Sequence, residues 1–246
     1  MKYNKTDVLL STLNLQFIKD FEYYLKTERA LGQATINKII QRFRRVVKEA
    51  IAEGFLDKDP FLLYKAKRVK KQVVFLSPEE LAQLELKEFA QPKLQLVKDL
   101  FVFSCYTGLA YNELFRLEDK HISKGFDDFL WINMQREKTA KAFAVPLLPK
   151  AEQVLNKYNT KGLIFPRLSN QKYNAYLKEV AHILGIDKRL TTHTARRTFA
   201  STVLLYNDVP MEIVSELLGH SSITITEESY GKIVQKKVSE QLKKLR

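Results

Sequence analysis

Cysteine is almost absent from the chain, which has a single one, Cys105, among 246 residues. One cysteine excludes an internal disulfide and a zinc site built from several thiolates, and it fits the reducing interior of a cell. The surrounding sequence, LFVFSCYTG, is typical of a buried helix. We therefore expect Cys105 to fill the core rather than to act as a nucleophile.

Long apolar runs are also missing. No stretch approaches the roughly 18 consecutive apolar residues of a membrane span. The first ten residues, MKYNKTDVLL, lack the basic-then-apolar layout of a secretory signal. The sequence shows no internal repeat and no low-complexity segment. Hydrophobic residues still make up 45% of the chain, so we expect a normal globular core and no membrane partner.

Acidic residues are scarce relative to basic ones, 28 against 41, which gives a net charge of +13. This excess suggests a polyanionic partner, because each neutralised phosphate releases counterions. Charge alone does not separate a nucleic-acid binder from a basic protein without a specific partner. A membrane surface is disfavoured, since no helical pattern pairs a basic face with an exposed aromatic stripe.

The pattern along the chain predicts two domains, 1–72 and 73–246. The boundary lies in a basic run, KAKRVKKQVVFL, that follows the turn signal DKDPF. A strong helix start comes next, with Ser77 as N-cap, Pro78 at the first helical position and Glu80 at the third. The predicted fold class is mainly α with a small β-sheet, an all-helical first domain preceding an α+β second domain.

In the first domain, residues 14–28 and 35–53 show a helical period. The second of these helices has one apolar stripe, formed by Ile36, Ile39, Ile40, Phe43, Val46, Val47 and Ile51. Lys38, Arg42 and Arg45 recur on another face. A solvated face is the plain interpretation, but residues 1–75 hold 16 basic and 8 acidic residues. We therefore predict that these three side chains face DNA.

The second domain mixes helices with two strands. Helices are expected at 78–90, 93–106, 111–117, 150–158, 169–184, 194–206, 210–218, 225–231 and, at the carboxyl end, 233–246. Strands are expected at 129–134 and 142–148, joined by the basic turn QREKTAK.

Three short segments of the second domain hold candidate catalytic groups. His193 and Arg196 are three residues apart at a helix start, so their side chains project to the same side. His220 follows Gly219, which has the pattern of a helix end. Tyr230 follows a possible capping box, TITE. Each feature alone has an ordinary structural explanation. A zinc site is disfavoured because no third ligand accompanies the two histidines and the arginines would repel a cation.

Taken together, these segments resemble the tyrosine recombinase (phage integrase) family. The matching stretches are TGLAYNEL (107–114), QREKTAKAFAVPL (135–147), HTARRTFAS (193–201) and LGHSSITITEESYGKI (218–233), and the resemblance covers nearly the whole chain. TGLAYNEL and DFEYYLKTE look most like integrases of mobile elements from the Bacteroidetes group. Those commonly carry an additional amino-terminal arm-binding domain, which this chain lacks, so the chain is expected to be a short member or a fragment.

The resemblance implies a role for each matching residue. Tyr230 would attack the scissile phosphate and leave a 3′-phosphotyrosine with a free 5′-hydroxyl. Arg196, His193 and His220 would contact the non-bridging oxygens, and Lys138 would protonate the leaving oxygen. Preorganised cationic donors of this kind stabilise the charge that develops in the transition state. No metal, ATP or other cofactor is implied, because the covalent link conserves the energy of the phosphodiester.

One position departs from the family pattern. Most relatives have an arginine after TGL, whereas this chain has Ala110. Arg116, Arg197 and Arg136 are candidates for the missing phosphate clamp. Arg136 is favoured, because a strand period of two would place it on the same face as Lys138, the expected general acid. Alternatively, Arg136 simply binds the DNA backbone. Glu113 matches an acidic residue that often supports the site.

The resemblance further implies double-stranded DNA as partner, a homotetramer on DNA, and a host DNA-bending protein as an additional candidate partner. A bacterial cytoplasmic location, with nucleoid association when bound, follows from the same reasoning. Two other functions stay open. The chain could be a non-catalytic DNA-binding member of the fold, disabled by Ala110, or a relaxing enzyme similar to type IB topoisomerases.

Overall fold

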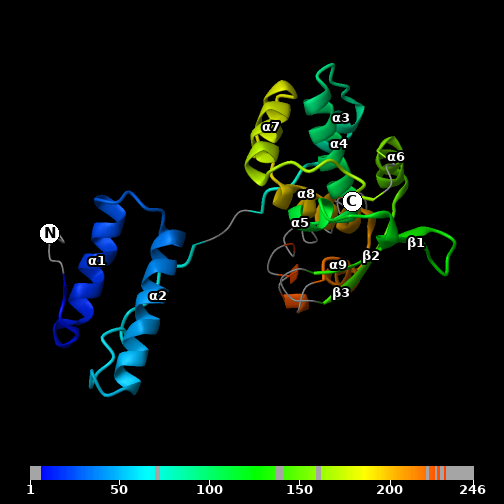
Figure 1. Cartoon of the computed structure of the whole chain (residues 1–246). Coiled ribbons are helices and arrows are strands. Elements are labelled where there is room, and N and C mark those ends of the chain that lie inside the picture. The colour runs from blue at the N-terminus through cyan, green and yellow to red at the C-terminus, as the bar shows by residue number, and fades with distance from the viewer. Residues whose placement is uncertain are drawn as a thin grey trace, which may run out of the picture. The chain divides into compact units, whose positions relative to one another are not determined.

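The computed structural model divides the chain into two compact units, Met1–Gln72 and Val73–Arg246. It describes residues 7–69, 73–136, 141–158, 162–219, 222–224, 226–227 and 230. Each unit has a hydrophobic core of its own, and each is described by itself. Figure 1 follows the chain through both. The fold is mainly helical with one small antiparallel sheet, as predicted.

Unit 1 is built on two helices, α1 (Leu15–Thr27) and α2 (Gln33–Ala52), which lie side by side (Figure 1). A short 3-10 turn precedes them at Leu10–Thr12. The side chain of Asn14 caps α1 by accepting a backbone hydrogen bond. Gly54 follows α2 with φ +79, a conformation that glycine adopts without strain. Both predicted helices are confirmed, with ends that differ by at most two residues.

Aromatic rings fill the core of unit 1. Phe43 of α2 packs edge to face on the fully buried Phe61, with ring centroids 5.3 Å apart. The predicted apolar stripe of α2 is confirmed at its buried members Ile36, Ile40 and Val47. Val46 was wrongly assigned to the stripe, since it is 59% exposed. Val46 points about 100° around the helix from the fully buried Val47, toward water.

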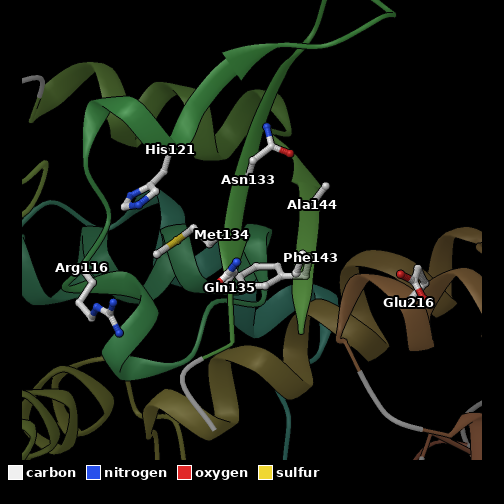
Figure 2. Close-up of a pocket in the computed structure, with 9 residues that line it drawn as sticks. Arg116, His121, Asn133, Met134, Gln135, Phe143, Ala144 and Glu216 are labelled. Carbon is white, nitrogen blue, oxygen red and sulfur yellow. The ribbon is translucent and has the colours of Figure 1, made fainter. Parts of the chain in front are cut away.

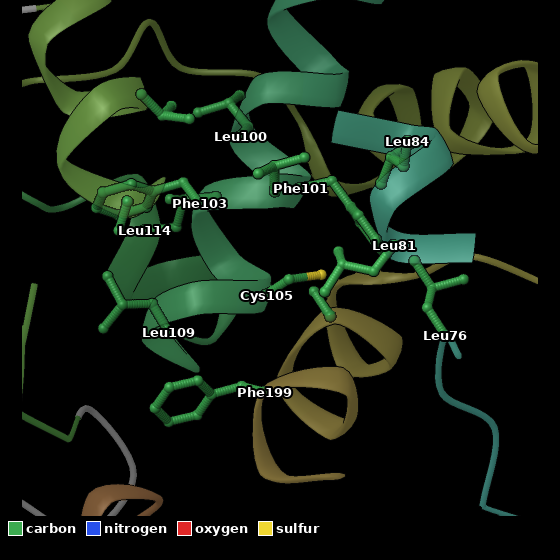
Figure 3. Packing of buried hydrophobic residues seen from close by; sticks show 14 of the residues in the cluster. Leu76, Leu81, Leu84, Leu100, Phe101, Phe103, Cys105, Leu109, Leu114 and Phe199 are labelled. Atoms are coloured by element: carbon green, nitrogen blue, oxygen red, sulfur yellow. The ribbon is translucent and has the colours of Figure 1, made fainter. Parts of the chain in front are cut away.

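Unit 2 is organised around the buried helix α4 (Pro92–Thr107), which contacts most of the other helices. Around it lie α3 (Pro78–Leu86), α6 (Pro149–Lys157), α7 (Asn170–Ile183) and α8 (Thr192–Thr198). A helix that is buried on nearly every side is apolar all round, which explains the sequence LFVFSC within α4. Cys105 is fully buried in this core, as predicted (Figure 3), and its burial raises the pKa of the thiol.

The predicted start of α3 is confirmed in detail. The backbone N–H of Glu80 donates to Ser77 Oγ at 3.2 Å, and the carboxylate of Glu80 accepts from the N–H of Ser77 at 2.7 Å. This capping box satisfies two donors that the first helical turn would otherwise leave unpaired. The helix ends at Leu86, four residues before its predicted end.

The sheet has three antiparallel strands in the order β1 (Ile122–Lys124), β2 (Leu130–Gln135) and β3 (Ala142–Pro146). Ile132 pairs with Val145, and both are fully buried against the helices. The two strands of the predicted hairpin are confirmed. The strand β1 was not predicted, because three residues are too few to show a period of two.

The region after α8 differs from the single helix predicted over 194–206. A π-helical turn at Phe199–Leu204 follows α8, and a 3-10 turn at Leu205–Asn207 follows that. The helix α9 (Met211–Leu217) then confirms the prediction for 210–218.

Two other predicted helices can be compared only in part or not at all. The helix predicted over 225–231 is described only at 226, 227 and 230, which are helical, and the one over 233–246 lies outside the described residues. Across the described part of the chain, no helix combines the length and the apolar character needed to cross a membrane.

Candidate active site

Gly108 ends helix α4 and begins the segment that carries Ala110. It has φ +66, and a Cβ atom at this position would lie 2.5 Å from the ring of Phe199. Only glycine therefore fits this turn. The carbonyl of Gly108 accepts a hydrogen bond from Nη1 of Arg196 at 2.7 Å. The turn thus fixes the start of α5 (Tyr111–Leu114) next to helix α8.

Glu113 is a buried acid with two partners. Its carboxylate accepts the backbone N–H of Ala110 at 2.8 Å, which caps the short helix α5. The same oxygen pairs with Nη1 of Arg136. The carboxylate of Glu113 therefore links Ala110, which departs from the family pattern, to Arg136, which is expected to replace the missing arginine.

Arg136 directly follows β2 and is only 8% exposed. Its guanidinium carbon lies 3.7 Å from the centroid of the Phe143 ring, and Nη2 donates to the carbonyl of Leu218 at 2.9 Å. The remaining donor, Nε, is buried and has no hydrogen-bond partner in the described part of the chain. Gly219, with φ +59, makes room for this side chain, since a Cβ there would lie 2.8 Å from Nε.

Arg196 meets Arg136 at one carbonyl group. Both guanidiniums donate to the oxygen of Leu218, at the carboxyl end of α9. Burial lowers the pKa of Arg196 to about 10, and the positive charge of Arg136 acts in the same direction. Glu113 opposes both effects. Two cations beside one carboxylate leave the site with a positive charge that favours an anion.

These side chains open onto one cavity of about 460 Å³. It is lined by Ala110, Tyr111, Asn112, Glu113, Arg136, Asn170, Thr192, His193, Arg196 and Gly219. His193, in the first turn of α8, is exposed at this cavity. The structure therefore brings together three of the predicted groups, His193, Arg196 and Arg136, around the space left by Ala110.

Tyr230 is almost completely buried, with 4% of its surface exposed. Burial raises the pKa of its phenol, and the positive charges of Arg197 and Arg196 oppose this rise. The phenol of Tyr230 is therefore close enough to Arg196 to be affected by its charge. Arg197, which neighbours Arg196 on α8, acts on the phenol as well.

Two predicted catalytic residues, Lys138 and His220, lie outside the described residues. The described residues on either side of them make the following contacts. The N–H of Arg136 donates to the carbonyl of Lys141 at 2.8 Å, which closes the base of the β2–β3 turn. Gly219 ends α9 and lines the cavity.

Arg116, another of the three clamp candidates, lines a different cavity of about 600 Å³ (Figure 2). That cavity lies along β2 and β3, with Arg116 and His121 on one side and Glu216 on the other. Neither Arg116 nor His121 lines the cavity at Ala110. Arg116 therefore lies at a different cavity from Arg136 and Arg196.

The predicted DNA-facing residues of unit 1 are exposed on α2. Lys38 and Arg42 make no ion pair within the described residues, whereas Arg45 pairs with Glu49 at 3.4 Å. A surface hollow of about 600 Å³ follows this face and is lined by Gln41, Arg42, Arg44, Arg45 and Lys48. Arg44 and Lys48, which the sequence analysis did not single out, also line this hollow, and Arg44 pairs with Asp59 at 3.5 Å.

Other parts of the site carried no sequence signal. Two arginines from distant segments donate to the same backbone carbonyl, that of Leu218. Every residue has such a carbonyl, so no pattern of side chains predicts this contact. Asn112 and Asn170 line the cavity as well, but asparagine is common in loops and at helix starts.

Comparison with known proteins covers both units. The model of the phage integrase family matches residues 74–236, and that of the phage integrase SAM-like domain matches residues 1–69. A tyrosine recombinase XerD of Oceanobacillus iheyensis is 31% identical over 232 residues, which cover 85% of this chain and 75% of that protein.

Solved structures share the fold at low sequence identity. The Tn1549 transposon integrase in complex with the transposon's right-end DNA has a TM-score of 0.76 and 17% identity, covering 96% of this chain and 87% of the other. A lambda integrase dimer bound to a core site has a TM-score of 0.75 and 18% identity, covering 92% and 82%.

Proposed function

The chain belongs to the phage integrase family of tyrosine recombinases, and on this premise we propose that it cuts and rejoins DNA through a covalent bond between Tyr230 and a DNA phosphate. It is a tyrosine-type site-specific recombinase. The observation that carries the proposed chemistry is the convergence of Arg136, Arg196 and His193 on one cavity.

The proposed reaction starts when the Tyr230 phenol loses its proton to water and its oxygen attacks the scissile phosphorus. The bond to the 5′ oxygen breaks, and Lys138 gives that oxygen its proton. The product is a 3′-phosphotyrosine and a free 5′-hydroxyl, and rejoining is the reverse attack by a hydroxyl. Bond energy is conserved in the ester, so the step needs no ATP, and the cationic side chains are assigned the charge stabilisation that a metal could otherwise supply.

The cations supply most of the expected acceleration. Attack adds negative charge to the non-bridging oxygens, and fixed donors in a site shielded from water stabilise that charge strongly. Arg196, His193 and His220 are assigned to these oxygens. Tyrosine has an ordinary pKa of about 10 and reacts poorly unless its phenolate is stabilised. The charges of Arg196 and Arg197 act in that direction.

Arg136 is assigned the place of the missing clamp arginine. Its guanidinium shares the Leu218 carbonyl with Arg196 and lines the cavity beside Ala110. Glu113 holds it from the other side, as a positioning residue. The alternative of a non-catalytic DNA-binding protein relied on the loss of that arginine, and this geometry gives it no support.

Double-stranded DNA is the proposed partner. Residues 1–72 would form a core-binding domain that contacts phosphates through Lys38, Arg42 and Arg45, and residues 73–246 would form the catalytic domain. We further propose a homotetramer on DNA, a host DNA-bending protein as additional partner, and a bacterial cytoplasmic, nucleoid-associated location. The motifs TGLAYNEL and DFEYYLKTE support a place among integrases of Bacteroidetes mobile elements.

A suicide substrate tests the chemistry. The site is first recovered by selecting duplexes that bind the protein from a random library, and a nick is then placed so that the released strand diffuses away. The wild-type protein should form a covalent complex that resists boiling in detergent, and Tyr230→Phe should bind the duplex but form none. A wild-type protein that binds and never becomes attached would refute the proposal. Relaxation of supercoiled plasmids without site preference would instead indicate a topoisomerase.

A further inference from the structure

Asn170 lines the cavity that holds the two arginines, although the proposed chemistry gives it no role. It is the first residue of α7 and is exposed. The preceding loop is fastened beside α5, since the hydroxyl of Tyr111 donates to the carbonyl of Leu168. The side chain of Ser169 caps α7 by accepting the N–H of Lys172 at 3.3 Å. These contacts hold the start of α7, and with it Asn170, at the cavity.

Asn174 fixes which way the amide of Asn170 is turned. Nδ2 of Asn174 donates to the backbone carbonyl of Asn170 at 2.7 Å, and to Oδ1 of Asn170 at 2.7 Å as well. A backbone carbonyl can only accept, so the atom of Asn174 beside it is the nitrogen. The atom of Asn170 that meets this nitrogen is then its oxygen. The NH2 group of Asn170 therefore faces away from Asn174, and it makes no hydrogen bond within the described residues.

The surroundings of this NH2 group favour an anion. Arg136 and Arg196 line the same cavity, and Nε of Arg136 is buried without a hydrogen-bond partner in the described part of the chain. Arg167 and Lys172 flank Asn170 in the sequence and are both exposed. Neither of these two cations forms an ion pair among the residues that the structure describes. A hydrogen-bond donor among such cations suits the oxygen of a phosphate.

We propose that Asn170 binds the DNA phosphate next to the scissile one through its NH2 group, and that Asn174 is the positioning residue that holds this donor in place. The inference rests on the proposed function. The cationic side chains of the site are already assigned to the scissile phosphate, whose two non-bridging oxygens they share. A contact with the neighbouring phosphate fixes the register of the strand without touching the reacting atoms.

Asn170→Asp separates this role from a structural one. A carboxylate at this position can still accept from Asn174, and a negative charge in the first turn of a helix is favourable, so the melting temperature should not fall. The carboxylate cannot donate, however, and it repels a phosphate. In a Tyr230→Phe background, which prevents cleavage, the dissociation constant for the selected duplex should rise on the order of 10²-fold. Asn170→Ala, which only removes the donor, should raise it about tenfold.

Gln171→Glu is the matched control. Gln171 is the next residue of α7, is exposed and is not among the residues that line the cavity, and its replacement changes the charge by the same amount. Its dissociation constant should stay within about threefold of the Tyr230→Phe protein, because an exposed charge is screened by salt. An equal loss of affinity in both variants would mean a general charge effect and would overturn the inference. Full affinity in Asn170→Asp would overturn it as well.

Uncharged phosphates in the duplex locate the contact. A methylphosphonate, which removes the negative charge, replaces one phosphate at a time. At one position beside the scissile phosphate, the proteins with and without Asn170→Asp should bind with similar affinity, because the repulsion disappears and the hydrogen bond weakens. A difference that persists at every position, or disappears only at the scissile phosphate, would overturn the inference. These affinities need no cleavage, so failure of the proposed chemistry and failure of this inference are distinguishable.

Discussion

The two groups of cations in this protein differ in almost every physical respect. Arg136 of unit 2 is buried and Arg196 is partly buried; they share one carbonyl and are held by Glu113 and Gly108. Lys38, Arg42 and Arg45 of α2 in unit 1 are exposed, and within the described residues only Arg45 of these three forms an ion pair, with the exposed Glu49. One group has fixed geometry, whereas the other has mobile side chains in water.

The difference teaches what each kind of charge can do. A buried guanidinium has lost its hydration before the reaction, so its charge acts at full strength on a developing phosphate charge. An exposed one is screened by salt and gives affinity through counterion release, with little demand on geometry. Changes in unit 2 should therefore alter rates, and changes on α2 should alter binding and its dependence on salt.

The largest effect is expected from removing Arg136. Arg136→Met alone would leave the buried carboxylate of Glu113 without its positive partner, so it is combined with Glu113→Gln. Cleavage at saturating protein should fall about 10²- to 10³-fold, the usual loss for one fixed donor. Binding should change little. Single-turnover cleavage of the suicide substrate measures the rate.

Two further variants make this comparison sharper. Glu113→Gln alone keeps the guanidinium and should retain most of the activity. Ala110→Arg, added to the double variant, places a guanidinium into the same cavity from the family's usual position and should recover at least part of the lost rate. Full activity in the double variant would remove Arg136 from the site.

The next largest effect concerns the face of α2. Replacing Lys38, Arg42 and Arg45 together by glutamine should weaken DNA binding about 10- to 100-fold at moderate salt, because up to three phosphate contacts are lost. The slope of log affinity against log salt should flatten by about 0.9 for each contact. Titrations at several salt concentrations measure both, and Lys178→Gln on α7 controls for loss of charge elsewhere. An unchanged slope would contradict a role for this face.

A smaller effect, on stability, is expected when inorganic phosphate binds beside Arg136 and Arg196. Burial and the nearby Arg136 charge lower the pKa of Arg196 to about 10, so its positive charge is less stable in the fold than in water, although the group stays protonated at neutral pH. A bound anion should relieve this and stabilise the fold by about 1–2 kcal/mol at saturating concentrations, seen as a rise of a few degrees in Tm. The variant with Arg136→Met and Glu113→Gln should lose this response. An equal rise in both proteins would indicate a non-specific salt effect.

The smallest effect is expected at the exposed ion pair of α2. Glu49→Gln frees Arg45 and removes one negative charge from the face, so DNA affinity should rise about two- to threefold. Stability should hardly change, because exposed pairs contribute at most about 1 kcal/mol. Glu179→Gln on α7 serves as the matched control. A loss of affinity in Glu49→Gln would mean that Arg45 needs its partner to be held in place.

Local signals in the sequence were enough for most of the elements. The capping box at Ser77 and Glu80, the helical periods of α1 and α2, and the alternation of β2 and β3 all depend on residues close together in the chain. The errors came where the pattern was short or ambiguous. β1 has three residues, Val46 lies beside a true core position, and the π-helical turn after α8 has no local signature.

The sequence by itself determined the family, the fold class and the candidate groups, because motif order and apolar periodicity are properties of the chain alone. Only the tertiary structure decided that Arg136 meets Arg196 at the Leu218 carbonyl and that Arg116 lies elsewhere. It also decided that Leu76 is bound to Thr198 and Thr202. These contacts join segments far apart in the chain, and several use backbone carbonyls that every residue possesses. Packing of the folded chain, rather than any local pattern, selects which of those carbonyls a given side chain reaches.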